Sequence, residues 1–158
     1  MQQAEVQDFI GTWRLLAYTF YHEDGTVEHP WGEDVVGYLL YTPQGYMSAN
    51  LSHALRRGRL RSALLKASAS NSAVEGGLTR LARRSAPRDY ISYAGRYELA
   101  GETILHHVEV SLFPHWVGLP QHRYYAFDDD QLTLRTATIS SGRGRHRVIA
   151  ELRWQHVS

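Results

Sequence analysis

The sequence predicts an all-β protein, an antiparallel β-barrel of about eight strands with one short helical insertion. Segments rich in β-branched and aromatic residues recur along the chain, and most are separated by short turns containing Gly, Pro or Asp. The strand–helix–strand spacing of a parallel sheet is absent from the pattern. The length of 158 residues suits a single domain, 1–158, with one core.

Composition excludes several classes of protein. Apolar residues make up 43% of the chain and charged residues 21%, which is typical of a folded globular domain. No apolar run approaches the roughly 20 residues that span a bilayer, and no cysteine is present for disulfides or thiolate chemistry. The N-terminus lacks the pattern of a signal peptide, so we expect a cytoplasmic protein that does not bind membranes.

The first third of the chain contains one helical turn, one long strand and a hairpin. Residues 1–10 fit the turn, and 11–21 fit the strand. Residues 37–51 fit a hairpin with its turn at 43–45. The more apolar face of this hairpin is predicted to point inward, and it comprises Tyr38, Leu40, Met47, Ala49 and Leu51.

Residues 90–118 form the centre of the pattern, with two strands joined by a turn at 100–102. Alternation places two sets of side chains inside: Tyr93, Gly95, Tyr97 and Leu99, then Ile104, His106, Val108, Val110 and Leu112. His107 and Glu109 then point outward. A register error of one residue would reverse this assignment.

The segment 52–88 interrupts the strands with helical spacing and an unusual charge. It carries nine basic residues against one acid, Glu75. We expect one or two short helices at an end of the β-structure, and this basic surface is a candidate binding site for an acidic carrier protein. It has no aromatic residues for stacking on bases, so nucleic-acid binding is not expected.

Two further hairpins complete the chain. If Phe127 pairs with Leu132 across the turn at 128–130, the side chains that share the inward face include Gln121, Arg123 and Tyr125. The final turn, 140–146, leads into the last strand, 147–154.

Taken together, these motifs resemble the lipocalin-like domain family. The resemblance is carried by residues 11–13 (GTW), 37–49, 93–99, 106–118, Gln121 with Arg123, and 132–134 (LTL). It implies an up-and-down, calycin-type barrel around a cavity for a small, mostly apolar molecule. It also implies that an arginine of the last strand, here Arg153, covers Trp13. Comparable small barrels in natural-product pathways act as cyclases or isomerases without a cofactor.

Arg123 is the sharpest functional signal in the chain. A guanidinium inside a barrel is costly unless it is paired, and no acid clearly shares its inward face. It could anchor a carboxylate or enolate oxygen of a ligand. Alternatively, a bulge turns Arg123 outward, or it stacks on Trp13 or Trp116.

The other candidate catalytic residues are His106, Tyr93 and Tyr97, which would transfer protons beside Arg123. The competing interpretation is that these tyrosines fill the core and hydrogen-bond one another. If the register is off by one, His107 with Glu109 becomes the acid–base pair; otherwise Glu109 pairs with Arg96 on the outer face. No metal site is expected, because adjacent histidines point to opposite faces.

These features favour a barrel that binds a hydrophobic, partly oxygenated small molecule and catalyses a cofactor-free cyclisation, isomerisation or dehydration. The alternative is a non-catalytic carrier, and a weaker one is an interaction module that uses the basic segment. We expect a monomer or a homodimer. The predicted ligand contacts are Tyr38, Leu40, Met47, Val108, Val110, Trp116, Gln121 and Tyr125.

Overall fold

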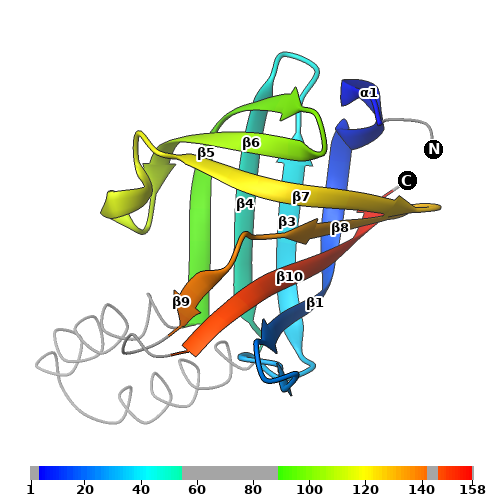
Figure 1. The fold of residues 1–158 in the computed structure, drawn as a ribbon. Helices are drawn as coiled ribbons and strands as arrows, with labels where there is room; N and C mark the ends of the chain where they lie inside the picture. The colour runs from blue at the N-terminus through cyan, green and yellow to red at the C-terminus, as the bar shows by residue number, and fades with distance from the viewer. Residues whose placement is uncertain (1–3, 55–88, 142–145, 158) are drawn as a thin grey trace, which may run out of the picture.

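The structure is a computed structural model that describes residues 4–54, 89–141 and 146–157 (Figure 1). Its strands form one antiparallel sheet in the order β2-β1-β3-β4-β5-β6-β7-β8-β10-β9, and β1 also pairs with β10. This last pairing closes the predicted eight-stranded barrel, with β2 and β9 as short additions. The elements are α1 (Val6–Phe9), β1 (Gly11–His22), β2 (Val27–Glu28), β3 (Val35–Tyr41), β4 (Tyr46–His53), β5 (Tyr90–Ala100), β6 (Thr103–Ser111), η1 (Pro114–Trp116), β7 (Pro120–Asp128), β8 (Gln131–Arg135), β9 (Ile139–Ser141) and β10 (His146–Val157).

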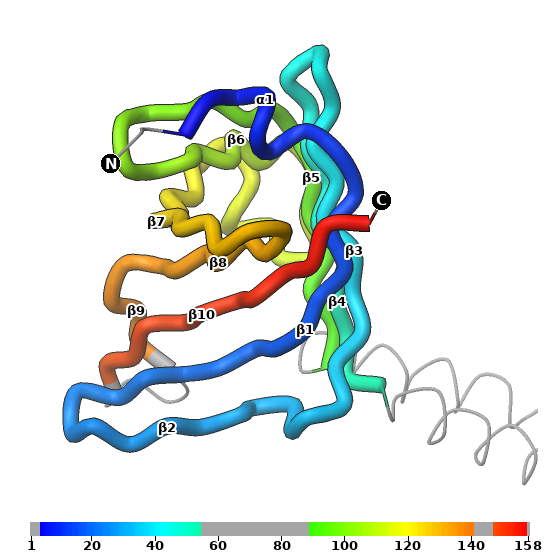
Figure 2. The backbone as a smooth tube through the Cα atoms, turned by 90° about the vertical axis from the view of Figure 1, so that its right-hand side faces the viewer, coloured from blue at the N-terminus to red at the C-terminus, as the bar shows by residue number. Residues whose placement is uncertain are grey.

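The first and last long strands close the barrel side by side, as Figure 2 shows. Their register runs from Thr12 opposite Val157 to His22 opposite Val148. One shift interrupts it between Leu15 and Ala17. Before this bulge the odd-numbered residues Trp13 and Leu15 are buried in the core, and after it the even-numbered residues Tyr18 and Phe20 point into the lumen. Simple alternation along the strand would not predict this change of phase.

Helix α1 and a group of aromatic rings fill one end of the barrel. Phe9 is fully buried, and its ring lies edge-on to Tyr125 and Phe127, at 5.1 and 4.9 Å between centroids. Trp13 Nε1 donates a 2.7 Å hydrogen bond to the carbonyl of Phe9, which fixes the helix to the barrel floor. This end of the lumen is therefore solid core.

The predicted inner face of the first hairpin was wrong for β3 and correct for β4, where Met47, Ala49 and Leu51 are buried. Tyr38 and Leu40 are 48% and 40% exposed, whereas Leu39 and Tyr41 point inward. The reason is the loop, which pairs Tyr41 with Met47 and so puts odd-numbered residues of both strands on the inner face. The turn at 43–45 is where the sequence predicts it.

A β-bulge in β6 turns Val110 outward, where it is 63% exposed, contrary to the prediction. Ala94 pairs with Val110, but the next residue, Gly95, pairs with Val108, so Glu109 is the extra residue. Up to Val108 the predicted alternation is correct. Arg153 was also wrongly placed: it is exposed, and His156 packs on Trp13 instead, at 4.8 Å between ring centroids.

The predicted helical insertion, 52–88, lies outside the described residues except at its start. There β4 continues through His53, two residues further than predicted. The proposed carrier-protein surface on this segment therefore stays a prediction. In the part of the chain that the structure describes, no helix is long and apolar enough to cross a membrane.

Candidate functional site

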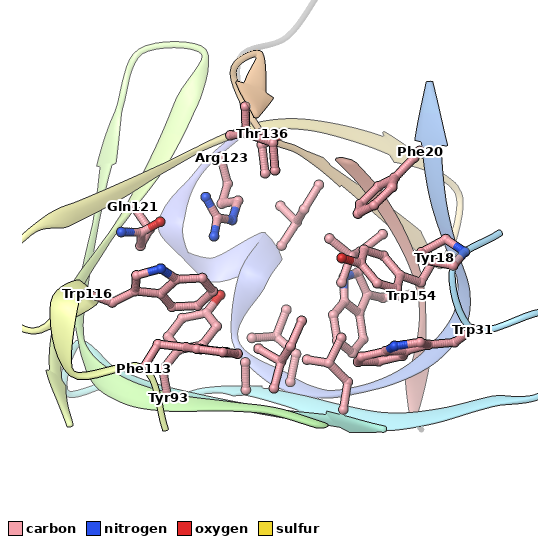
Figure 3. A pocket seen from close by; sticks show the side chains of 18 of the residues that line it. Tyr18, Phe20, Trp31, Tyr93, Phe113, Trp116, Gln121, Arg123, Thr136 and Trp154 are labelled. Carbon is pink, nitrogen blue, oxygen red and sulfur yellow. The ribbon is translucent and has the colours of Figure 1, made fainter. Parts of the chain in front are cut away.

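A cavity of about 680 Å³ lies in the half of the barrel away from α1 (Figure 3). Side chains from both bulged and regular strands line it, together with residues of η1 and the loops at this end. The lining residues are Tyr18, Phe20, Pro30, Trp31, Leu39, Ala49, Leu51, Ile91, Tyr93, Phe113, Trp116, Gln121, Arg123, Leu134, Thr136, Ile139, Ser140, Leu152 and Trp154. The volume is in the range of small-molecule sites.

The cavity wall is mainly apolar and includes seven aromatic side chains. On one side, Trp116 of η1 packs edge-on against Tyr93 at 5.5 Å and lies 4.8 Å from Phe113. On the other side, Tyr18 and Trp31 meet edge-on at 4.9 Å between centroids. Figure 3 shows these two groups facing each other across the pocket. Such a wall suits a flat or conjugated apolar molecule.

Arg123 lies inside the lumen, as predicted, and is only 8% exposed. It sits on β7 opposite Ile104 of β6, and one of its Nη atoms donates a 3.0 Å hydrogen bond to the backbone carbonyl of His122. Among the described residues no carboxylate forms an ion pair with it. Within the described residues, the Arg123 guanidinium thus borders the cavity with most of its N–H donors unused and with no acid paired to it.

His106 lies beneath the cavity, fully buried between two tyrosine hydroxyls. Its Nε2 is 2.6 Å from the Tyr41 hydroxyl, and its Nδ1 is 3.1 Å from the Tyr93 hydroxyl. Burial lowers the pKa of His106 well below its usual value, and the charge of Arg123 lowers it further. The imidazole is therefore neutral, and of the three residues only Tyr93 lines the cavity.

Tyr41 and Tyr18 are also held in their neutral forms. Burial raises the pKa of Tyr41 well above its usual value, while Arg123 opposes this. Burial raises the pKa of Tyr18 to about 12, again against the effect of Arg123. On the same side of the cavity Trp154 Nε1 is a buried donor with no acceptor among the described residues.

The structure brings some of the predicted site residues to the cavity and leaves others elsewhere. Arg123, Tyr93, Trp116 and Gln121 line it. Three are buried but do not line it, namely His106, Met47 and Val108. Tyr97 and Tyr125 belong to the filled end, where their hydroxyls donate to the carbonyls of Thr42 and Gly101. Tyr38, Leu40 and Val110 lie on the outer surface.

The alternative acid–base pair is not formed. His107 Nε2 lies 3.2 Å from Glu98, and Glu109 lies 3.6 Å from Arg96, on the outside of the sheet. The cross-strand pairing of Glu109 with Arg96 is the one that alternation favours. In the described ranges no cluster of three His, Asp or Glu side chains could hold a metal ion.

Several lining residues escaped the sequence analysis. Tyr18 and Phe20 were missed because the first strand is too rich in apolar residues for alternation to choose a face, and a bulge then shifts the phase. Trp31 and Phe113 come from irregular segments whose side-chain directions have no periodicity. Tyr41, which does not line the cavity but contacts His106, was missed because its strand was assigned the opposite face.

The chain was compared with known families and structures. A family model for the lipocalin-like domain matches residues 10–157. No curated protein matches the chain. A lipocalin-like protein from Bacteroides uniformis ATCC 8492 is 13% identical, with a TM-score of 0.45 covering 95% of this chain and 99% of that one. A redesigned β-barrel is also 13% identical, with a TM-score of 0.42 covering 97% and 95%.

Proposed function

The chain belongs to the lipocalin-like domain family, and from this premise we propose that its barrel binds a hydrophobic, partly oxygenated small molecule and converts it without a cofactor. The lipocalin-like barrel itself is consistent with small-molecule binding. The reactions that suit the cavity are a cyclisation, an isomerisation or a dehydration. All three need a substrate held in one shape, and none needs a redox group or an activated nucleophile.

One observation carries the proposal: the buried guanidinium of Arg123 borders a mostly apolar cavity and has no acid beside it in the described structure. An uncompensated buried charge lowers the stability of the protein. A ligand oxygen with negative charge would remove that cost, while the aromatic wall would bind the rest of the molecule. The polar and apolar parts of the cavity thus match a molecule that is mostly apolar with an oxygen at one end.

If the protein is an enzyme, Arg123 stabilises the negative charge that develops on a substrate oxygen, and Tyr93 exchanges a proton with the substrate. The aromatic wall folds the substrate and excludes water. Positioning of this kind can lower a barrier by about 7 kcal/mol in well-oriented cases. His106 does not touch the substrate in this scheme and acts through Tyr93.

A carrier without chemistry is the second candidate, and one observation favours it. No carboxylate or imidazole is among the described residues that line the cavity, so the site offers no strong base. A carrier needs only affinity, which the aromatic wall and Arg123 would supply. The two candidates share the binding step and differ only in what happens to the bound molecule.

Retention of metabolites tests the binding step. The purified protein is incubated with a metabolite extract, and the retained compounds are identified by mass spectrometry. The matched control is Ala49→Phe, which puts a ring into the cavity and leaves every polar lining group in place. We expect the wild type alone to retain apolar compounds that carry an acidic oxygen. Equal retention by both proteins would contradict the proposal.

Turnover separates the catalyst from the carrier. The retained compound is incubated with catalytic amounts of wild type, Arg123→Ala and Tyr93→Phe, and both conversion and affinity are measured. A cyclase or isomerase loses turnover by a larger factor than affinity in both variants. A carrier returns the compound unchanged from every protein.

A further inference from the structure

We infer that the chain of hydrogen bonds from Tyr41 through His106 to Tyr93 fixes the Tyr93 hydroxyl as a donor into the cavity. With Arg123 it forms an oxyanion site, so the ligand is a weak acid bound as its anion: an enolate, a phenolate or a carboxylate. This inference rests on the proposed function and narrows the class of ligand that the cavity takes. It also gives Tyr41, which does not line the cavity, a positioning role.

The number of protons in the hydrogen-bond chain limits how it can be arranged. A neutral imidazole carries one N–H, so one of its nitrogens donates and the other accepts. In one arrangement Tyr41 donates to Nε2, and Nδ1–H donates to the Tyr93 oxygen. In the other, Tyr93 donates to Nδ1, and Nε2–H donates to the Tyr41 oxygen.

The burial of Tyr41 decides between the two arrangements. Tyr41 is 2% exposed, and in the described structure its hydroxyl has no partner besides His106. The second arrangement would leave the Tyr41 proton buried without an acceptor, which is costly. The first arrangement satisfies that proton and leaves the Tyr93 proton free. His106 is thus held with its proton on Nδ1.

The position of Tyr93 decides where its free proton points. Tyr93 lines the cavity, and in Figure 3 it lies on the same side of the pocket as Arg123 and Gln121. Its hydroxyl oxygen is already occupied as the acceptor of the Nδ1–H bond. The remaining proton of Tyr93 and the N–H groups of Arg123 are donors, and Arg123 cannot accept a hydrogen bond. This side of the cavity therefore favours an acceptor with negative charge.

The surrounding charges agree with this preference. The titratable groups that act on the three hydrogen-bonded residues from neighbouring elements are Tyr97 on β5 and Arg123 on β7, while His107 on β6 points away to Glu98. Across the cavity, Tyr18 on β1 interacts with Arg123 and with the exposed Glu28 on β2. Tyr18 and Tyr97 are neutral, because burial raises the pKa of each. Arg123 is the one buried charge among these groups. An anionic ligand would be its counter-charge.

A pair of probes of nearly equal shape tests the inference: 7-hydroxycoumarin, which ionises to a phenolate, and 7-methoxycoumarin, which cannot. Both are small enough for a cavity of about 680 Å³. The absorbance of bound 7-hydroxycoumarin is followed against pH under saturating protein. We expect its apparent pKa to fall by about one unit on binding, which means that the anion binds about tenfold more tightly than the phenol. The affinity for 7-methoxycoumarin should not change with pH over the same range.

Two hydroxyl deletions locate the source of the anion preference. Tyr93→Phe removes the donor itself. Tyr41→Phe removes the group that fixes the His106 proton, so Tyr93 becomes free to donate to Nδ1 instead of to the ligand. Each should remove the part of the anion preference that the Tyr93 hydrogen bond supplies and leave the part that Arg123 supplies. The double variant should lose no more than Tyr93→Phe alone, because both changes break one chain.

Tyr97→Phe is the matched control, because it also deletes the hydroxyl of a buried tyrosine. The ring centroids of Tyr97 and Tyr41 are 4.8 Å apart. Its hydroxyl bonds to the Thr42 carbonyl in the filled end, so the anion preference should stay as in wild type. Binding of 7-methoxycoumarin by each variant shows that its cavity is intact.

The possible outcomes separate the two proposals. If 7-methoxycoumarin and 7-hydroxycoumarin both fail to bind, the cavity is no ligand site and the proposed function fails with the inference. If both bind and the phenolate is not preferred, only the inference is overturned. If the preference exists but Tyr41→Phe behaves like Tyr97→Phe, the hydrogen-bond chain does not orient Tyr93, and that part of the inference is overturned.

Discussion

Gly95 lies against the backbone carbonyl of His107 so closely that a β-carbon at this position would overlap it. The contact belongs to the bulge at which β6 has one residue more than β5. A glycine inside a strand often marks such a close approach of two backbones. Because of the bulge, the regular inward–outward alternation of β6 side chains ends at Val108, and Val110 points outward.

Gly95→Ala should therefore lower the free energy of unfolding by about 1–3 kcal/mol, the usual cost of forcing extra volume into a packed region. Gly45→Ala is the control. Gly45 has a φ of +85° but an open position, with only the Tyr97 carbonyl at 4.0 Å from an added β-carbon. Its cost should be the smaller one, about 1 kcal/mol of backbone strain. Urea denaturation of both variants checks this, and an equal or smaller loss for Gly95→Ala would contradict the close contact.

The buried imidazole of His106 should make stability depend on pH. Its pKa in the folded state lies below the usual value of 6.5, so on acidification the unfolded state takes up the proton first. The stability that this neutral imidazole contributes is complete above about pH 6.5 and is lost as the pH falls below it, until the folded-state pKa is reached. The steepest loss is about 1.4 kcal/mol per pH unit.

Denaturation curves of wild type and His106→Gln between pH 7.5 and pH 4.5, at about half-unit steps, measure this contribution by difference. The amide of glutamine can bond to both tyrosine hydroxyls but does not titrate. We expect the wild type to lose stability relative to the variant as the pH falls. Parallel curves would contradict a neutral buried imidazole.

Two ion pairs on the outer surface should contribute very differently to stability. Glu151 is buried, and its carboxylate lies 2.6 Å from Arg135, with the Tyr21 hydroxyl at 3.4 Å. Arg135→Met would leave this buried carboxylate without its cation, at a cost of about 1–3 kcal/mol.

Arg96→Met is the matched change in the exposed pair of Arg96 with Glu109, where the two charged groups are 3.6 Å apart. It should cost less than about 1 kcal/mol, as is usual for exposed pairs. The two free energies of unfolding are compared at one pH and one salt concentration. Equal costs would show that water solvates Glu151 as well as it solvates Glu109.

The fold could be predicted from the sequence because its turns are marked by residue type and its strands by composition. Where the sequence predicted one cross-strand pair correctly, it also predicted the inner face of the hairpin. Phe127 does pair with Leu132, and Arg123 is inside for that reason. The strand of Tyr41 was assigned the wrong face because Leu39, Leu40 and Tyr41 are all apolar. Composition could not choose a face there, and only the loop geometry did.

The site was predictable in part. His106 was expected inside among tyrosines, and it is. Its partner Tyr41 could not be found from the sequence, because β3 and β6 are not neighbours in the sheet and meet only across the closed lumen. Alternation indicates which side chains enter a barrel, but the contacts between opposite walls depend on its tilt and closure.

Arg123→Met tests the central claim, that the protein keeps an uncompensated charge in its cavity for a ligand. The measurement is the free energy of unfolding in urea without ligand, alongside retention of metabolites from extract. If the charge serves only the ligand, replacing it by an apolar side chain of similar length should stabilise the free protein by about 1–4 kcal/mol and abolish retention of acidic compounds. A less stable variant that still retains them would contradict the account.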